Sequence, residues 1–210
     1  LAQTADSIPR VILLGRLSLY GRRAERRHEE IIPLAARWSE PSQRQGALSA
    51  YGREAEAKTL DLLDRSLDGN GARSPNPVIR EKLLASAPRD IEELLPQLEP
   101  RAEEVAAAAI ERLRQRGERE QQDLRAVLER QRDRVREELE KHDRKKDQLT
   151  INFSDEEKRQ LEANVRSWRL RLEQFEGDLE QEPARIRDFY EVRAKRVEPV
   201  GLVYLWPESN

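Results

Sequence analysis

The feature that most limits the fold is a long stretch without helix breakers. Residues 101–148 contain no proline and one glycine, Gly117, and consist mainly of Arg, Glu, Ala, Gln and Leu. At about 1.5 Å per residue, a helix over this stretch would be roughly 70 Å long. A small globular domain cannot bury a helix of that length. We therefore expect a helix that projects, over most of its length, from the rest of the protein.

A second helical stretch follows almost at once. Ser154 stands three residues before Glu157, which is the pattern of a capping box at a helix start. Beyond it, apolar residues recur at intervals of four and three, as in the a/d seam of a coiled coil. The seam residues are Leu161, Val165, Trp168, Leu172, Phe175 and Leu179. Two helices joined by a short loop pack antiparallel most readily, so residues 101–182 are predicted to form a helical hairpin with its tip near 145–154.

The first helix carries a less regular apolar stripe than the second. Gly117, Gln121 and Gln131 stand where apolar residues would continue the stripe. Two arrangements therefore stay open: the intramolecular hairpin, which predicts a monomer, and a dimeric coiled coil built on the second helix. We predict the first and expect Trp168 and Phe175 to be packing residues in its seam.

The two ends of the chain have the pattern of strands. In Arg10–Gly21 (RVILLGRLSLYG), one face is apolar throughout and the other turns polar at Arg16. Near the C-terminus, Val200–Trp206 alternates between Pro199 and Pro207. Each segment is too apolar to stand alone as an exposed edge. We predict that they pair in a short two-stranded β element.

The rest of the chain is predicted to be helical, which gives a mainly α fold. We expect a helix over Arg22–Trp38 that is kinked or divided at Pro33, a polar connector over Glu40–Ala50 and a helix over Arg53–Leu67. After these we expect a disordered linker over Asp68–Pro75, short helices from Asn76 to about Leu98 divided by Pro88 and Pro96, and a return helix after Pro183. The predicted domains are a helical base with the first strand (1–100), an antiparallel coiled-coil arm (101–182), and a return helix and strand that rejoin the base (183–210).

Composition excludes several classes of function. The chain has no cysteine, which excludes disulfides, thiolate metal sites and a cysteine nucleophile. Its 39 basic and 41 acidic residues balance, so the chain as a whole is not a polycation for nucleic acid. No apolar run approaches the roughly 18 residues of a membrane span, so no membrane partner is expected. The absence of methionine, even at position 1, predicts an excerpt of a longer protein.

The search for catalytic or cofactor motifs is negative. The phosphate-binding and dinucleotide-binding glycine loops are absent. His28-Glu29-Glu30 begins like a zinc helix, but Ile32 occupies the position of the second histidine, so we interpret His28 as a solvated helix residue. His142 lies among charged residues near the predicted tip and is expected to be exposed. No catalytic residue, metal or cofactor is predicted.

Two basic groups are the candidate binding residues. Arg22, Arg23, Arg26 and Arg27 fall within six residues, and helical spacing would place them on neighbouring faces suited to backbone phosphates. The second group is Arg144, Lys145 and Lys146 at the predicted tip. We predict both groups as nucleic-acid-binding, with the first as the main contact.

Four segments carry a resemblance to a known family: RVILLGRLSLYG (10–21), HEEIIPLAARW (28–38), YGREAEAKTL (51–60) and RVEPVGLVYLWP (196–207). In that order they resemble the C-terminal end of large bacterial Swi/Snf-like superfamily 2 helicases, of the type found in the DISARM antiphage defence system. The resemblance implies a cytoplasmic protein whose ATPase motor lies upstream, and it transfers no catalytic residue to this chain.

Together these observations predict a non-catalytic C-terminal accessory region of an ATP-dependent DNA helicase or translocase. It would support the motor of the same chain and contact DNA, with the arm contacting another defence-system protein. The alternative is a structural coiled-coil adaptor that mediates protein interaction or oligomerisation without nucleic acid. Balanced charge favours the adaptor, whereas the Arg22–Arg27 cluster and the resemblance favour the helicase region.

Overall fold

The chain divides into two units in the computed structural model, which describes residues 2–4, 7–68, 76–149 and 154–207. We call Leu1–Ile110 with Val192–Asn210 the sheet unit, and Glu111–Glu191 the hairpin unit. Helix α2 (Pro77–Leu149) contributes residues to both. The protein is mostly helical (66%), which confirms the predicted mainly α class. No helix in the described ranges is both long and apolar enough to cross a membrane.

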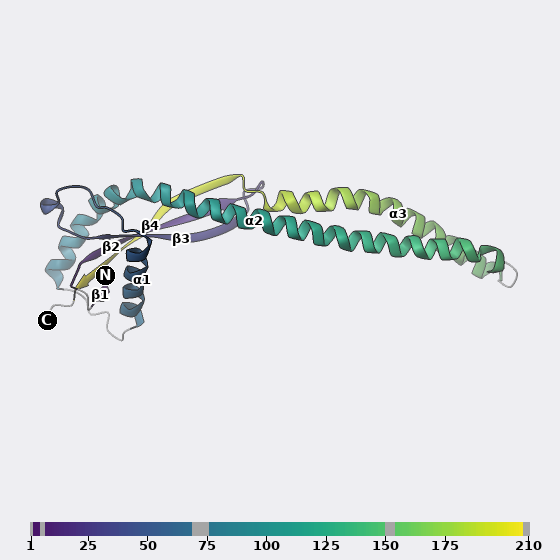
Figure 1. Ribbon diagram of the computed structural model, residues 1–210, viewed down its shortest axis with the longest axis horizontal. Coiled ribbons are helices and arrows are strands. Elements are labelled where there is room, and N and C mark those ends of the chain that lie inside the picture. Colours follow the sequence, from purple (N-terminus) through teal and green to yellow (C-terminus); the bar gives the residue numbers. More distant parts are fainter. Residues whose placement is uncertain (1, 5–6, 69–75, 150–153, 208–210) are drawn as a thin grey trace. The chain divides into compact units, whose positions relative to one another are not determined.

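The sheet unit contains one four-stranded sheet with the order β1-β4-β2-β3 (Figure 1). Its strands are β1 (Ala2–Thr4), β2 (Arg10–Tyr20), β3 (Arg26–Arg37) and β4 (Ala194–Pro207). Strands β2 and β4 pair antiparallel along their whole shared length, which confirms the predicted pairing of the terminal segments. The predicted two-stranded element is wrong, because β3 also pairs antiparallel with β2 and β1 adds parallel to the end of β4. Strand β4 also begins six residues earlier than predicted.

Strand β3 occupies the segment that the sequence analysis assigned to a helix kinked at Pro33. Ile32, Leu34 and Ala36 alternate along it and are buried, which is the period of a strand. Pro33 is tolerated because β3 is an edge strand, where a missing N–H can point away from the ladder. The helix prediction for Arg22–Trp38 is therefore wrong, and the helical spacing of its arginines does not exist. His28 accordingly lies on a strand, 3.0 Å from Glu30 Oε2.

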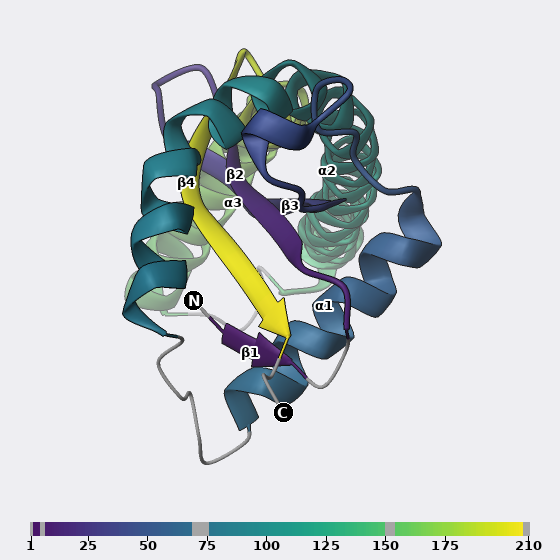
Figure 2. The same cartoon turned by 90° about the vertical axis from the view of Figure 1, so that its left-hand side faces the viewer.

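Two helices cover opposite faces of the sheet (Figure 2). On one face α1 (Arg53–Asp68) packs its Leu60 and Leu63 against a buried cluster that contains Ile12 and Ala35. This confirms the predicted helix over Arg53–Leu67. On the other face the first part of α2 packs against the opposite side of β2. The buried residues there are Val11, Leu13, Leu17 and Leu19 on β2 with Leu83, Leu94, Leu98, Ala102 and Ala106 on α2.

Gly15 lets helix α2 approach the sheet closely. A Cβ at this position would lie 2.6 Å from Leu98 Cδ1, closer than atoms can approach, and Leu98 is itself buried. Gly15, which interrupts the apolar face of β2, therefore lies where α2 crosses this strand.

Helix α2 is one continuous helix, where short helices divided by proline were predicted. Asn76 caps it by accepting a hydrogen bond from Val78 N at 3.0 Å. Pro88, Pro96 and Pro100 lie inside it with exposed side chains. The helix continues because its other face is held in the core by buried residues on both sides of each proline. Local propensity predicts breaks here, and tertiary packing overrides it.

The hairpin unit consists of the second part of α2 packed against α3 (Asp155–Tyr190) (Figure 1). The predicted capping box is confirmed, with Ser154 and Glu157 exchanging both hydrogen bonds. The predicted seam residues of α3 are its less exposed ones, and Phe175 is 2% exposed. On α2 the seam includes the buried Leu128 and Gly117. A Cβ at Gly117 would lie 2.9 Å from Tyr190 Cβ, so the glycine permits close helix packing.

Two further predictions about the hairpin unit are corrected. Helix α3 does not end at Pro183, which is buried inside the helix, and the predicted return helix is the last part of α3. His142 is not exposed: its ring packs edge-on against Trp168 at 6.4 Å between centroids, because it occupies a seam position. The predicted linker (68–75) lies outside the described residues except for Asp68, as do positions 150–153 of the predicted tip.

Candidate functional site

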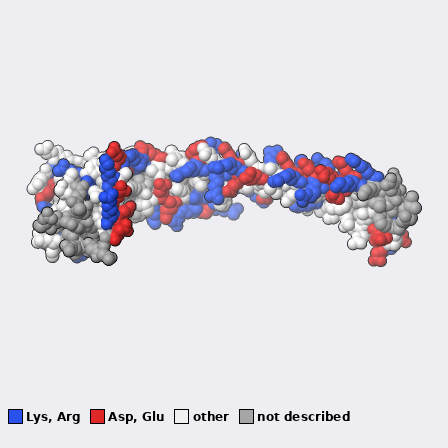
Figure 3. All heavy atoms as spheres, turned by 60° about the horizontal axis from the view of Figure 1, so that its bottom comes forward, with Lys and Arg blue, Asp and Glu red and all other residues white. Residues whose placement is uncertain are grey.

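Half of one face of the sheet has no covering helix among the described residues. On β2, Ile12, Leu14, Arg16, Ser18 and Tyr20 share a face, because alternate residues of a strand point the same way. The first two pack against the cluster covered by α1. The face continues beyond α1 without an apolar cover: the Arg16 side chain is 41% exposed. Figure 3 looks onto this side of the sheet unit and shows basic side chains, with acidic ones among them, beyond α1.

Register identifies the other residues of this uncovered face. Arg16 lies opposite Ile31 on β3 and Glu198 on β4, and Ser18 lies opposite Glu29 and Arg196. Directly opposed residues point to the same face of a sheet. Ile31 is 50% exposed and the Arg196 side chain 67% exposed. The uncovered face therefore carries charged side chains from three strands, ending at Tyr20.

Arginine and glutamate form a small network on this face. Glu198 binds Arg16 through one oxygen and Arg196 Nη2 through the other at 2.7 Å. The hydrogen bond from Arg16 is the main reason why the pKa of Glu198 lies below its usual range. Arg26 binds Glu29, which also accepts a bond from Ser18 Oγ at 3.4 Å. The carboxylates hold the guanidinium groups in place.

A tight turn at the end of this face presents the first two predicted arginines. Gly21 N donates to Glu25 O at 2.9 Å, and Ala24 N donates to Gly21 O at 3.2 Å. Ala24 has a φ of 58°, a conformation that costs a non-glycine residue of the order of 1 kcal/mol. Arg22 and Arg23 are exposed on this turn. The turn therefore holds both side chains at the outer end of the β2–β3 hairpin.

The other residues of the first predicted group are divided by a β-bulge. Tyr20 lies opposite Arg26, whereas Leu19 lies opposite His28, so Arg27 is an extra residue on β3. The Arg27 side chain is 9% exposed and binds Glu25, which leaves it little access to a ligand. The structure thus brings Arg22, Arg23 and Arg26 to one end of the sheet and turns Arg27 inward.

The second predicted group lies at the end of α2 in the hairpin unit. Arg144 is exposed and binds Glu140 at 3.4 Å. Lys145 and Lys146 belong to the same helix, but their side chains lie outside the described residues.

The structure adds Arg16 and Arg196 to the candidate site, and sequence reasoning missed both. Arg196 was assigned to a helix, although β4 brings it beside Ser18 of β2. One sequence feature could have indicated this site: the face of the first strand that turns polar at Arg16. A strand face changes in this way where its cover ends. We call Arg16, Arg22, Arg23, Arg26 and Arg196 with Glu29 and Glu198 the basic sheet surface, which has an excess of three positive charges.

A second polar group in the sheet unit is buried and structural. Asp90 on α2 is fully buried and accepts hydrogen bonds from Trp38 Nε1 at 2.9 Å and Tyr204 Oη at 2.7 Å. Arg44, 2% exposed, donates to Asp90 at 2.5 Å and to Glu93 at 2.6 Å. These hydrogen bonds link the segment after β3, which contains Arg44, to α2 and β4.

Burial and hydrogen bonding shift the pKa values of two side chains in this network. Burial, with the bond to Asp90, raises the pKa of Tyr204 well above its usual range, so the phenol stays protonated as a donor. Burial alone would raise the pKa of Glu93, but hydrogen bonds from Leu48 N, Arg89 and Arg44 lower it overall. The stability that Glu93 contributes is therefore present at neutral pH and lost as pH falls through its folded pKa.

Three comparisons with known proteins found no match. No known protein family matches the chain. Neither the curated proteins nor the solved structures contain a match. Among the described residues, no three His, Asp or Glu side chains gather as metal ligands would.

Proposed function

We propose that the chain is a non-catalytic accessory region of an ATP-dependent DNA helicase or translocase, which contacts DNA through the basic sheet surface. In this proposal the motor belongs to the same polypeptide, acts in the cytoplasm and hydrolyses the nucleotide, while this region supports it. The support is the sequence resemblance together with one structural observation, the uncovered half-face of the sheet with its excess of arginine.

The chemistry of this surface suits a phosphate backbone better than base edges. Guanidinium groups donate paired hydrogen bonds to phosphate oxygens. Arg22 and Arg23 on the turn and Arg196 on β4 stand at the rim, where a duplex or a single strand would reach them. Contacts of this kind position a protein on nucleic acid but carry no sequence information. The proposal therefore predicts weak, non-specific and salt-dependent binding.

Salt dependence gives the first test. Each phosphate contact contributes about 0.9 to the slope of log affinity against log salt. Replacing Arg22, Arg23, Arg26 and Arg196 together by glutamine should lower that slope by roughly 2–4 units. Fluorescence anisotropy with labelled duplex and single-stranded oligonucleotides measures it in the wild type and the variant.

A matched control removes the same charge from the hairpin unit. Arg114, Arg116, Arg125 and Arg185 are all exposed and all bind a carboxylate of their own helix. Their joint replacement by glutamine should leave the slope within about one unit of the wild type, the contribution of a single contact. If the two variants change the slope equally, net charge and not the basic sheet surface governs binding, and the proposed contact is wrong.

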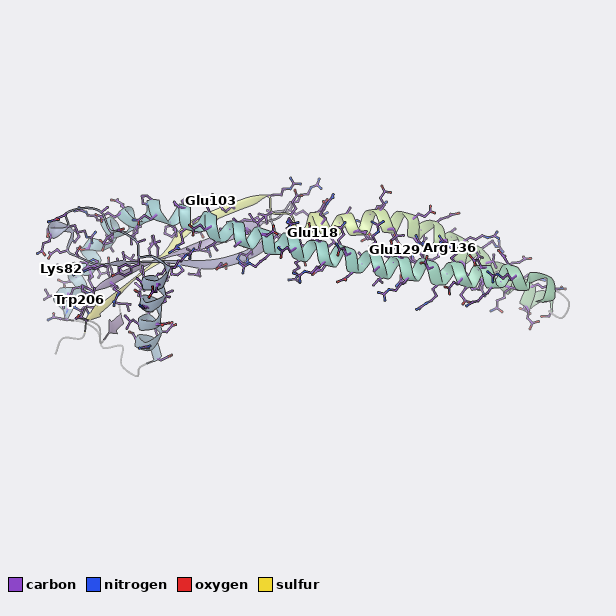
Figure 4. The ribbon with its side chains drawn as sticks, in the orientation of Figure 1. Lys82, Glu103, Glu118, Glu129, Arg136 and Trp206 are labelled. Atoms are coloured by element: carbon purple, nitrogen blue, oxygen red, sulfur yellow. The ribbon has the colours of Figure 1, made fainter. Side chains whose placement is uncertain are left out.

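The structural adaptor is the second candidate, and the hairpin unit supplies the observation that favours it. Its cations are largely engaged by acids one turn away, and a hydrogen bond from Arg114 lowers the pKa of Glu111 to about 2. Figure 4 labels three such charged residues, Glu118, Glu129 and Arg136, along α2. If the wild-type chain binds neither oligonucleotide at about 50 mM salt, where phosphate contacts are strong, the adaptor becomes the better account.

A further inference from the structure

A groove on the surface of the hairpin unit is lined by one apolar side chain, one amide and two arginines. It has a volume of about 260 Å³ and is lined by Val127, Arg130, Gln131 and Arg134 of α2. These residues follow the spacing i, i+3, i+4, i+7 and therefore form one stripe over two turns of the helix. Val127 is 39% exposed, so part of its apolar surface is open to a ligand.

The two arginines of the groove differ from their neighbours. Arg125 binds Glu129, and Arg132 and Arg136 both bind Asp133. Within the described part of the chain, neither Arg130 nor Arg134 has a carboxylate within ion-pair distance. Arg130 instead donates to the carbonyl oxygen of Ala126 at 3.1 Å, which holds its guanidinium group along the helix. Two available cations thus stand one turn apart beside an exposed valine.

The size of the groove indicates what could occupy it. Pockets for small molecules usually have volumes of about 300–1,000 Å³ and enclose most of the ligand. This groove is smaller and lies open on a helix surface. Its dimensions suit one apolar side chain in the middle and a carboxylate at each arginine. A helix that carries two acidic residues at i and i+4 presents them about 6 Å apart, which matches the spacing of Arg130 and Arg134.

Nucleic acid fits this surface less well. A bound strand tracks a run of available cations, but Asp133 lies between the two groove arginines in the sequence of α2 and Glu129 directly precedes the first. On the face of the hairpin unit that Figure 3 shows, acidic and basic side chains are intermixed. An acidic helix, in contrast, could bind through contacts with the two arginines and the valine alone.

We propose that the groove formed by Val127, Arg130, Gln131 and Arg134 docks an acidic amphipathic helix of a partner protein. An apolar residue of that helix packs on Val127, and carboxylates one turn apart bind Arg130 and Arg134. The mode is helix-in-groove recognition with charge complementarity as its specificity. This inference concerns the hairpin unit alone and does not depend on the DNA contact of the basic sheet surface.

The test uses the full chain and a pair of synthetic peptides. The acidic probe is a fluorescein-labelled helical peptide of about 20 residues, long enough to form a helix in water, with two leucines per heptad flanked by glutamates. Its twin has arginine in place of every glutamate. We expect the wild type to bind the acidic probe at least tenfold more tightly than the twin, as measured by fluorescence anisotropy.

Charge reversal separates the groove from general attraction. The double variant Arg130→Glu/Arg134→Glu should lose at least tenfold in affinity for the acidic probe and gain affinity for the basic twin. The control variant Arg166→Glu/Arg169→Glu changes two exposed arginines of α3 and should bind the acidic probe as the wild type does, within about threefold. Circular dichroism verifies that both variants keep the helix content of the wild type, which we expect because all four side chains are on the surface.

Three results would overturn the inference. They are equal losses of affinity in the two charge-reversal variants, failure of the wild type to prefer the acidic probe, and displacement of that probe by a duplex oligonucleotide. The last result would assign the groove to nucleic acid instead.

Discussion

Replacing Asp90 by alanine should lower the free energy of unfolding of the sheet unit by about 3–5 kcal/mol, the usual cost of leaving a buried charge without its partner. Arg44 would keep Glu93 but lose its buried partner, and Trp38 and Tyr204 would lose their common acceptor. Urea unfolding followed by tryptophan fluorescence measures the change. A Trp168→Phe background confines the signal to Trp38 and Trp206, both of the sheet unit.

Two comparisons make this result specific to the network. Asp61 on α1 is exposed, so Asp61→Ala should change the free energy of unfolding by no more than about 0.5 kcal/mol. Asp90→Asn keeps an oxygen that accepts from Trp38 and Tyr204 but removes the charge beside Arg44, and should fall between the two. An Asp90→Ala variant as stable as Asp61→Ala would show that the network does not fasten the connector to α2.

Phe175→Ala should destabilise the hairpin unit by about 3–5 kcal/mol, the range for truncating a buried phenylalanine. Phe175 is 2% exposed in the seam, and the guanidinium carbon of Arg171 lies 4.4 Å from its ring centroid. Thermal unfolding followed by far-ultraviolet circular dichroism should show the helical transition at a clearly lower temperature. Leu170→Ala serves as the control on the same helix, because Leu170 is 60% exposed.

The same experiment distinguishes the hairpin from a dimeric coiled coil. An intramolecular hairpin unfolds at a temperature that does not depend on protein concentration, whereas a dimer becomes more stable as concentration rises. We expect no dependence for the wild type or for Phe175→Ala. A transition that moves upward with concentration would favour the intermolecular seam, and equal effects of Phe175→Ala and Leu170→Ala would remove Phe175 from the seam altogether.

The parts of the fold that local pattern determines were predictable from the sequence. The heptad spacing from Leu161 to Leu179 identified the seam of α3, and Ser154 with Glu157 identified its start. The alternation in β2 and in the last strand predicted their pairing. In each case many residues repeat one period, so no single residue decides the assignment.

Several of the errors concern prolines, whose effect depends on tertiary position. Pro33 was predicted to kink a helix, but it lies in an edge strand. Pro88 and Pro96 were predicted to divide short helices, but they lie on the solvent side of a continuous helix whose opposite face is packed. Whether a missing N–H is tolerated depends on which side of the element faces a neighbour. The local sequence does not contain that information.

The candidate site was predictable only in part, for the same reason. The cluster Arg22–Arg27 was visible in the sequence. However, a turn and a β-bulge determine where its side chains point, and helical spacing does not. Arg16 and Arg196 are separated by most of the chain and meet only because β4 returns beside β2. Pairing of the two terminal segments was predicted, but the strand extension that brings Arg196 into register was not.

Amide hydrogen exchange of the full chain, with and without a saturating duplex oligonucleotide, tests most directly whether the basic sheet surface binds DNA. We predict slower exchange in peptides that cover residues 16–30 and 193–198, where the turn and the exposed ends of β2, β3 and β4 lie. Peptides from 111–144 and 155–190 should be unchanged, because the cations of the hairpin unit are largely engaged. Slower exchange confined to the hairpin unit, or no change in either unit while the oligonucleotide is bound, would contradict the proposed contact.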